Sequence, residues 1–381
     1  MAASLPSSRV AAIRRRLLDH YDRERRDLPW RGETDPYRVW VSEVILQQTR
    51  VETAIPFYRS WLERFPTLEA LAASDPEGVM AAWSGLGYYR RARHLHRAAL
   101  MVRDQLGGEL PTEANLLQEL PGIGPYTAGA LASIAFGRRE PAVDGNARRV
   151  LSRLFDLERP SATGLRRLAG ALVPPDRPGD FNQALMELGA TVCRPRRPRC
   201  AECPLARLCL ASRRGTVMAR PGAPRNRAVP EREVGTAVLL SARRRVLLAR
   251  RPDEGLLGGM WEFPGAVAHD RERPAAAARR AAAALLGPNG LPPRRAPARP
   301  IAVIPQAFSH RRHVYHAFLL GLPDEPPFLL PVASGTTPEA PEWTAAEWVA
   351  VEGLVPLGER ALPSAQRRIA RAVLAAPREW A

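Results

Sequence analysis

The chain has 381 residues, of which 45% are hydrophobic and 25% are charged, so it is long enough to form two globular domains. Its formal net charge is +17, which favours an anionic partner and first of all a nucleic acid, although a compositional bias toward Arg would give the same charge. The sequence holds no lysine, which excludes a lysine Schiff base and a P-loop lysine, and no apolar run long enough for a transmembrane helix.

The N-terminal part of the chain has helical patterns. Residues 1–21 are rich in Arg, like a transit peptide, but their apolar residues fall on one side and predict an ordinary amphipathic helix. Asp35 opens the next predicted helix, which runs to Gln48. Further helical patterns cover residues 53–64, 68–73 and 76–84. Glu43 lies off the apolar line of the helix that begins at Asp35, so the pattern alone indicates a solvated side chain without a role.

A loop rich in glycine and aromatic residues follows at Gly85–Arg91. Its glycines, the apolar Leu86, the aromatic Tyr88 and the two arginines together suit insertion into a duplex beside the phosphates. A loop whose tyrosines pack inward is the commoner alternative and stays open.

The stretch Leu120–Asn146 organises the chain. It begins with a Pro-Gly-Ile-Gly turn that cannot continue a helix, followed by a proline suited to the first position of a new one. The amides around Gly122 and Gly124 can then bind a phosphate at the positive end of that helix, although a purely structural turn is the alternative. The small residues of 127–132 allow another backbone to pack closely. Asp144 precedes a further helix, which is the usual place of an N-cap.

All four cysteines lie in one short segment with the spacing C-x6-C-x2-C-x5-C: Cys193, Cys200, Cys203 and Cys209. Nothing marks the chain as secreted, so a disulfide framework is not expected. A zinc ion is an alternative, but zinc sites usually have paired CxxC knuckles. Four thiols in one compact loop, with a proline beside the third, favour a [4Fe–4S] cluster.

The second part of the chain is rich in strand patterns. Residues 213–233, with many Arg and Pro, predict a basic linker. Predicted strands cover residues 234–240, 246–248, 301–304, 314–320 and 343–348. An Ala-rich helix is predicted around 275–286. Phe308, Ser309 and His310 fall between two of these strands, where a plain hairpin connection is the alternative to a functional loop.

Several of these stretches together resemble the MutY-type adenine DNA glycosylases of the helix-hairpin-helix, endonuclease III-like superfamily. They are LPWR, SEVILQQT, GLGYYRRA, LPGIGPYTAGA, VDGN, FNQALMELG, the four cysteines, WEFPG and FSH. The resemblance implies a multidomain protein. An all-α helix-hairpin-helix glycosylase domain over 1–212, with an iron–sulfur loop at 193–209, precedes the linker at 213–233. An α/β (α+β) Nudix-like domain would cover 234–381.

The resemblance also implies roles for residues. Glu43 would be the general acid that protonates adenine at N7, Asp144 would stabilise the oxocarbenium ion, and Tyr126 stands where bifunctional relatives carry a catalytic lysine. Burial would raise the pKa of Glu43, and the helix start would favour an ionised Asp144. The base pocket would contain Trp30, Arg31, Leu46, Asn146 and Gln183. DNA would contact Gln48, Thr49, Leu86, Tyr88, Gly122 and Gly124. Phe308, Ser309 and His310 would recognise 8-oxoguanine.

The partner implied is double-stranded DNA with an 8-oxoguanine:A or G:A mispair, and the expectation is a cytoplasmic, nucleoid-associated monomer without a membrane partner. The Ala-rich helix lacks the glutamates of a Nudix box, so the second domain is expected to recognise rather than hydrolyse. Three alternatives stay open: a glycosylase for other mismatches or oxidised pyrimidines, a Nudix pyrophosphatase, and a non-catalytic iron–sulfur DNA-binding protein.

Overall fold

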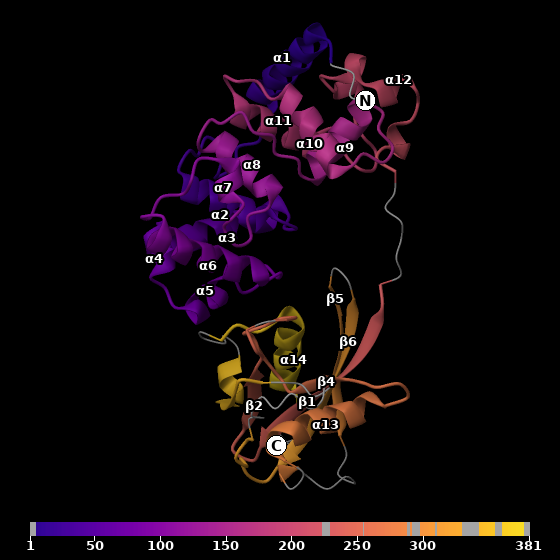
Figure 1. Ribbon diagram of the computed structural model, residues 1–381. Helices are drawn as coiled ribbons and strands as arrows, with labels where there is room; N and C mark the ends of the chain where they lie inside the picture. Colours follow the sequence, from indigo (N-terminus) through magenta and orange to yellow (C-terminus); the bar gives the residue numbers. More distant parts are fainter. Residues whose placement is uncertain are drawn as a thin grey trace. The chain divides into compact units, whose positions relative to one another are not determined.

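A computed structural model describes residues 5–222, 229–253, 255–287, 290–291, 298–308, 311–329, 343–354 and 360–376. The chain divides into two compact units, Met1–Ser74 with Arg91–Asn226, and Asp75–Arg90 with Arg227–Ala381 (Figure 1). The domain boundaries given above stay a prediction. In the part of the chain that the model describes, no helix combines the length and the apolar character needed to cross a membrane.

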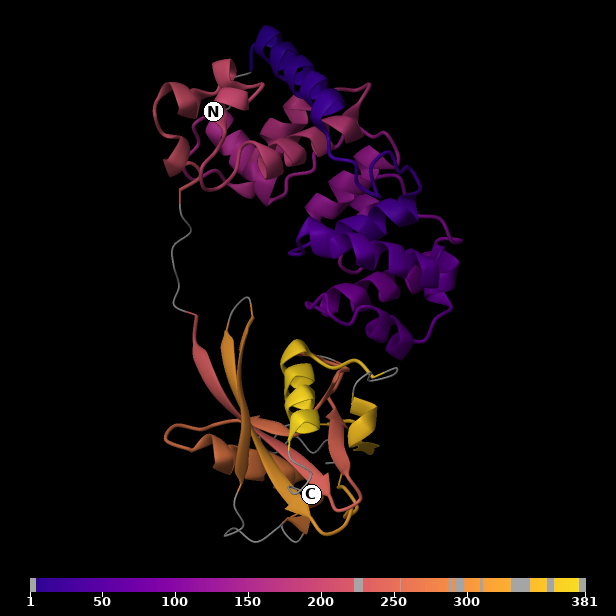
Figure 2. The same cartoon turned by 180° about the vertical axis from the view of Figure 1, so that it is seen from behind.

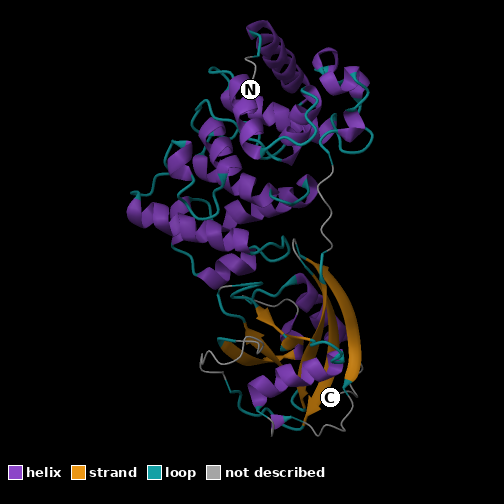
Figure 3. Ribbon diagram, turned by 45° about the vertical axis from the view of Figure 1, so that its right-hand side comes forward, coloured by secondary structure: helices purple, strands orange, loops and turns teal. Residues whose placement is uncertain are grey.

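The N-terminal part of the chain is built from helices, as predicted (Figure 3). They are α1 Ser7–Glu24, α2 Pro36–Leu46, α3 Val51–Arg64, α4 Leu68–Ala72, α5 Pro76–Ala82, α6 Arg90–Gln105, α7 Ala114–Leu117, α8 Pro125–Ile134, α9 Gly145–Leu154, α10 Ala162–Leu172, α11 Pro178–Thr191 and α12 Leu210–Arg213. Side-chain N-caps explain several starts, because an oxygen of the cap accepts a free backbone N–H of the first turn. These caps are Asp35, Thr67, Asp75, Asp144 and Ser161.

The unit Met1–Ser74 with Arg91–Asn226 is called the helical unit below. Its core lies between α1, α9, α10 and α11, with Leu17, Leu151 and Phe181 fully buried. Two glycines of this unit permit close approaches of neighbouring segments. A Cβ on Gly129 of α8 would lie 2.2 Å from the carbonyl oxygen of Pro141, and a Cβ on Gly189 of α11 would lie 2.6 Å from the Cβ of Asn146. The second approach seats the start of α9 against α11.

The second unit contains one mixed sheet, so the predicted α+β class is confirmed. Its strands are β1 Glu231–Ser241, β2 Arg245–Arg250, β3 Trp261–Glu262, β4 Gly265–Val267, β5 Arg299–Ala307, β6 Arg312–Leu322 and β7 Ala345–Ala350. The order is β3-β2-β1-β6-β5, with β4 paired to β1 and β7 to β2. β1 runs parallel to β6, and the other pairs are antiparallel.

One helix covers each face of this sheet. α13 Pro274–Leu286 packs in one apolar cluster and α14 Ser364–Ala375 in the other, on opposite sides of the strands (Figure 2). Gly235 in β1 permits the α13 contact, because a Cβ there would lie 1.9 Å from the carbonyl oxygen of Pro274.

Candidate active site

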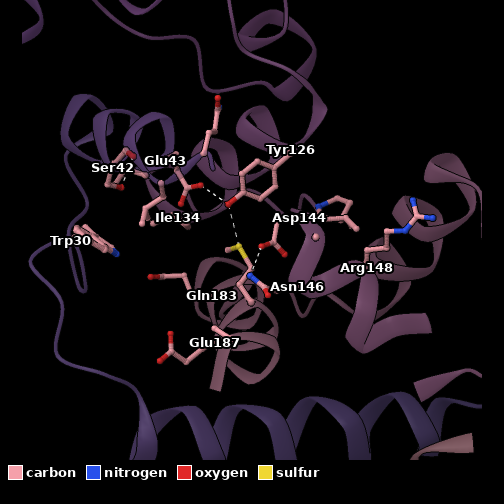
Figure 4. Close-up of a pocket in the computed structure, with 18 of the residues that line it drawn as sticks. Trp30, Ser42, Glu43, Tyr126, Ile134, Asp144, Asn146, Arg148, Gln183 and Glu187 are labelled. Carbon is pink, nitrogen blue, oxygen red and sulfur yellow. Dashed lines mark hydrogen bonds between the residues drawn. The ribbon is translucent and has the colours of Figure 1, made fainter. Parts of the chain in front are cut away.

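A cavity of about 1020 Å³ lies within the helical unit. Residues of α2, of the turn after it and of α11 line it, together with the starts of α8 and α9 (Figure 4). The fold therefore brings segments more than a hundred positions apart in the sequence around one space. The lining includes Trp30, Arg31, Glu43, Leu46, Gln48, Thr49, Tyr126, Asp144, Asn146 and Gln183.

Glu43 is buried in the cavity wall, with 7% of its surface exposed. The solvated side chain that the helical pattern indicated is therefore wrong. Its Oε2 accepts a hydrogen bond of 2.5 Å from the hydroxyl of Tyr126 (Figure 4). Burial raises the pKa of Glu43 to about 7; the Tyr126 hydrogen bond lowers this pKa, and the charge of Asp144 raises it. A carboxyl group with such a pKa can hold a proton at neutral pH and release it to a substrate.

Tyr126 stands in the first turn of α8, directly after the Pro-Gly-Ile-Gly turn. Its hydroxyl also lies 3.2 Å from the sulfur of Met186. Burial, with the nearby Glu43 carboxyl as a further cause, raises the pKa of Tyr126 well above its usual value. The phenol therefore stays protonated and serves as a hydrogen-bond donor to Glu43.

Asp144 is the N-cap of α9 and faces the cavity as well, so a cap and a site residue coincide. Its Oδ1 accepts the backbone N–H of Ala147 at 2.6 Å, and its Oδ2 accepts the side-chain amide of Asn146 at 2.8 Å. Asn146 in turn accepts from Arg149 at 2.7 Å, and Arg149 donates to the carbonyl of Cys193 at 2.8 Å. Donors at a helix start favour a negatively charged carboxylate.

Among the lining residues that the sequence analysis did not identify, Glu187 and Arg26 form an ion pair in the cavity wall. Glu187 accepts hydrogen bonds from Arg26 at 2.6 Å and from Arg31 at 2.5 Å, and Arg31 also donates to Gln183 at 2.5 Å. Although burial acts in the opposite direction, the Arg26 hydrogen bond lowers the pKa of Glu187. The sequence held one signal: Glu187 follows Gln183 by four positions in α11, so both share one helical face.

Four other predicted DNA contacts do not line the cavity: Leu86, Tyr88, Gly122 and Gly124. The two tyrosines of the Gly85–Arg91 loop differ, since Tyr88 is 49% exposed and Tyr89 is buried. The inward-packing alternative thus holds for Tyr89 alone, and Leu86 is buried with it. In the α7–α8 hairpin, Gly122 has a φ of 81°, and a Cβ there would lie 2.6 Å from that of His94.

Of the predicted lesion-reading residues, Ser309 and His310 lie outside the described residues. Phe308 follows β5, and its backbone N–H donates to the carbonyl of Arg311 at 2.8 Å. The Phe308 ring contacts that of His313 edge-on, with 5.1 Å between centroids. Strands β5 and β6 flank this segment, and its role in lesion recognition stays a prediction.

The four cysteines lie on the segment between α11 and α12, and each is partly buried. Burial raises the pKa of the Cys203 thiol to about 12, with smaller contributions from the other three cysteines, so the four lie within electrostatic range of one another. Among the described residues, no three His, Cys, Asp or Glu side chains form a site for a single metal ion.

In the second unit, α13 carries no acidic residue. Glu262 of β3 is buried, but its Oε1 is held by Arg251 at 2.8 Å and by the indole N–H of Trp343 at 3.2 Å. This carboxylate is therefore engaged in an ion pair inside its own domain.

Comparison with known proteins agrees with both units. A family model described as HhH-GPD superfamily base excision DNA repair protein matches residues 41–175, and a NUDIX domain model matches 235–372. The structure of a thermostable thymine-DNA glycosylase superposes with a TM-score of 0.51 at 29% identity, over 54% of this chain and 98% of that one.

Curated relatives carry the name adenine DNA glycosylase. That of Mus musculus is 42% identical over 320 residues, which are 69% of this chain and 62% of the relative. That of Schizosaccharomyces pombe is 36% identical over 320 residues, which are 67% of this chain and 69% of the relative. The chain spans about 60% of the length of the mammalian relatives. The helical unit with Glu43 and Asp144 in its cavity, the Nudix-like sheet and these identities together place the chain in the MutY-type adenine DNA glycosylase family.

Proposed function

We propose that this protein removes adenine paired with 8-oxoguanine or guanine from double-stranded DNA by hydrolysis of the N-glycosidic bond. The observation that carries the proposal is the pair of carboxyl groups in one cavity, with Glu43 buried at a pKa of about 7 and Asp144 bonded to N–H donors. One protonated and one ionised carboxyl group are what glycoside cleavage requires. Because a paired base is not accessible inside a duplex, the adenine must be flipped into the cavity.

In this mechanism Glu43 donates its proton to N7 of the flipped adenine, so that the base leaves as a neutral molecule. The sugar gains positive charge as the bond breaks, and the Asp144 carboxylate stabilises that charge. Water then completes the hydrolysis. Trp30, Arg31, Leu46, Asn146 and Gln183 would form the walls around the base.

We propose that the reaction stops at base removal. A lyase step needs an amine that attacks the sugar, and the chain has no lysine. Tyr126, in the position of the lyase lysine in bifunctional relatives, holds Glu43 instead. Borohydride treatment during turnover should trap no covalent DNA adduct, and a robust trapped band would contradict this step.

The remaining predicted residues would act on the DNA itself. Gln48, Thr49, Leu86 and Tyr88 would fill or brace the distorted duplex, and the amides around Gly122 and Gly124 would bind a backbone phosphate. Phe308, Ser309 and His310 would read the oxidised guanine, with the second unit as a recognition module. Domain boundaries at 212 and 233 belong to the same proposal.

We further propose that Cys193, Cys200, Cys203 and Cys209 hold one [4Fe–4S] cluster. Their spacing in the sequence and their mutual proximity support it. The cluster would order the basic loop that presents Arg194, Arg196, Arg197 and Arg199. Stoichiometric zinc without labile sulfide, in protein made anaerobically with ample iron, would refute the assignment.

Single-turnover cleavage of four duplexes, with 8-oxoguanine:A, G:A, G:T and A:T pairs, tests the function. We expect rapid adenine release from the first, slower release from the second and none from the others. Preferred cleavage at G:T would instead favour a thymine glycosylase, like the thymine-DNA glycosylase whose structure superposes on the helical unit. The same duplexes with Asp144→Asn should bind but not be cleaved, because phosphate contacts dominate affinity.

A further inference from the structure

The end of α2 has an unusual backbone. The helix carries Glu43 and ends at Leu46, only three residues later. Gln48 then has a φ of 58°, in the left-handed region that residues other than glycine rarely adopt. Such a conformation persists where the surroundings fix it. Something in the fold must therefore hold the turn that follows the Glu43 helix.

Arg91, in the first turn of α6, makes the contacts that do this. Its Nη1 donates to the carbonyl oxygens of Val44 at 2.8 Å and Ile45 at 3.0 Å, and also to that of Gln47. The same guanidinium lies 3.4 Å from the hydroxyl of Thr49. The last carbonyls of a helix lack intrahelical donors, and a basic side chain can satisfy them. Arg91 thus bonds on both sides of Gln48.

A second contact ties the same turn to α8. The side-chain amide of Gln47 donates to the hydroxyl of Thr127 at 3.3 Å, and Thr127 is the neighbour of Tyr126. The hydrogen bond of 2.5 Å between Glu43 and Tyr126 spans this same pair of helices. The distance between the general acid and its partner is therefore set by a turn that Arg91 anchors.

We propose that Arg91 is a positioning residue. It fixes the end of α2 and thereby holds Glu43 where it can protonate a base bound in the cavity. This rests on the proposed role of Glu43 as the acid. Arg91 acts through the backbone carbonyls and does not touch the substrate.

A guanidinium near the predicted DNA contacts could instead bind a phosphate. Lysine can substitute for arginine in that role, but not as an anchor of the turn after α2. An ammonium group serves as a phosphate ligand, but its donors rotate at the end of a flexible stem, whereas the rigid guanidinium holds Nη1 directed at the three carbonyl oxygens. Arg91→Lys should therefore preserve a phosphate contact and break the anchor. Arg91→Met removes both. Arg97→Lys, at an exposed position of the same helix, is the matched control.

The first measurement is amide hydrogen exchange in the protein without DNA, followed in peptides that cover residues 44–50. We expect both Arg91 variants to exchange about tenfold faster there, with the rest of α2 less affected and Arg97→Lys unchanged. This readout needs no activity, so it stands even if adenine excision is absent. Native exchange in Arg91→Lys would overturn the anchor. A variant that fails to fold is recognised by its circular dichroism, and the other variant then decides.

The second measurement is single-turnover excision at saturating protein from pH 5 to 9. We expect Arg91→Lys to lower the plateau rate about tenfold, since small displacements of a catalytic group have effects of this size or larger. The pH at which the rate of this variant falls on the alkaline side should be lower than in the native protein. A loosened α2 admits water to Glu43, and hydration favours its charged form. Faster exchange with a native rate and pH profile would overturn the positioning role. A second result would also overturn it: a native rate in Arg91→Lys, together with a weaker salt dependence of DNA binding in Arg91→Met. A slope of log affinity against log salt that is smaller by about one marks the loss of a phosphate contact. Failure of the native protein to release adenine would refute the proposed function.

Discussion

The two units each bury one glutamate in a different setting. Glu43 in the helical unit and Glu262 in the sheet unit are 7% and 4% exposed, and burial raises the pKa of both. At Glu262 a direct ion pair with Arg251 and the indole of Trp343 oppose the effect of burial. At Glu43 the opposing group in contact is the neutral hydroxyl of Tyr126, and the charge of Asp144 adds to the rise. Glu262 therefore has a cation in contact that favours its charged form, whereas the group in contact with Glu43 is neutral.

The same contrast holds at the helix starts. In the helical unit α9 begins with Asp144, which lines the cavity. In the sheet unit α13 has no acidic residue in its first turn or elsewhere, although helix starts favour anions. A carboxylate thus stands at the helix start beside the cavity, whereas α13 carries none.

The largest expected effect separates the two glutamates. Glu43→Gln removes a donatable proton and should lower the single-turnover excision rate by about 10³-fold or more. This is the range expected when a general acid and its electrostatic stabilisation of the transition state are both lost. Glu262→Gln should leave the rate within about twofold and lower the melting temperature instead. Duplex binding by both variants serves as the control. An equal loss of rate in both would remove the distinction drawn between the units.

Two glycines test whether the units depend on each other. Gly129→Ala places a Cβ 2.2 Å from the Pro141 carbonyl oxygen, and Gly235→Ala places one 1.9 Å from that of Pro274. Each should lower the unfolding free energy by about 3 kcal/mol or more, since packed backbone cannot yield. We expect Gly129→Ala to reduce all excision. Gly235→Ala should spare G:A cleavage and weaken the preference for 8-oxoguanine:A. Calorimetry would show which transition moves, and loss of G:A cleavage in Gly235→Ala would contradict independent roles.

Local patterns predicted much of the helical unit and the general class of the second. The caps at Asp35 and Asp144 and the strands around 301–304 and 314–320 are present, because turn chemistry and periodicity are local properties. The sheet ends were less accurate. β1 begins at Glu231, among exposed polar residues, because its parallel pairing with β6 extends the strand beyond its apolar part.

The burial of Glu43 was beyond any local pattern. Its position off the apolar line of α2 is that of a solvated residue. It lies in the cavity wall because the fold brings Tyr126, 83 positions later, into contact with it. The family resemblance supplied its role, whereas the pattern did not. The ion pairs of Glu187 are likewise non-local, since Arg26 lies 161 positions earlier. Polar residues that meet only through the tertiary fold leave little signal in the spacing of one sequence.

Stability should depend on pH through Glu43. Its pKa is raised from 4.5 to about 7 on folding, so between these values the folded protein binds a proton that the unfolded chain has lost. The free energy of unfolding therefore falls as pH rises across this window, by up to about 3 kcal/mol. The free energy of unfolding of Glu43→Gln does not fall in this way, because the variant has no carboxyl group at this position. The variant should therefore be more stable than the native protein at pH 8, and the difference in stability between the two should be smaller below pH 4.5. Urea unfolding at both pH values measures it, and an advantage that is independent of pH would disprove the assigned shift.

The smallest expected effect concerns the hydroxyl that Glu43 contacts. The Tyr126 hydrogen bond lowers the pKa of Glu43 against the effect of burial, so Tyr126→Phe should raise that pKa further. The acid form then persists to higher pH, and the alkaline limb of the excision rate should move up by about one pH unit, equivalent to about 1.4 kcal/mol. Tyr37→Phe, which alters a buried tyrosine of α2 outside the cavity, is the matched control and should leave the limb in place. A limb that moves down in Tyr126→Phe would mean that the hydroxyl supports the proton on Glu43 instead of the charge. The contrast with Glu262 would then rest on the Arg251 cation alone.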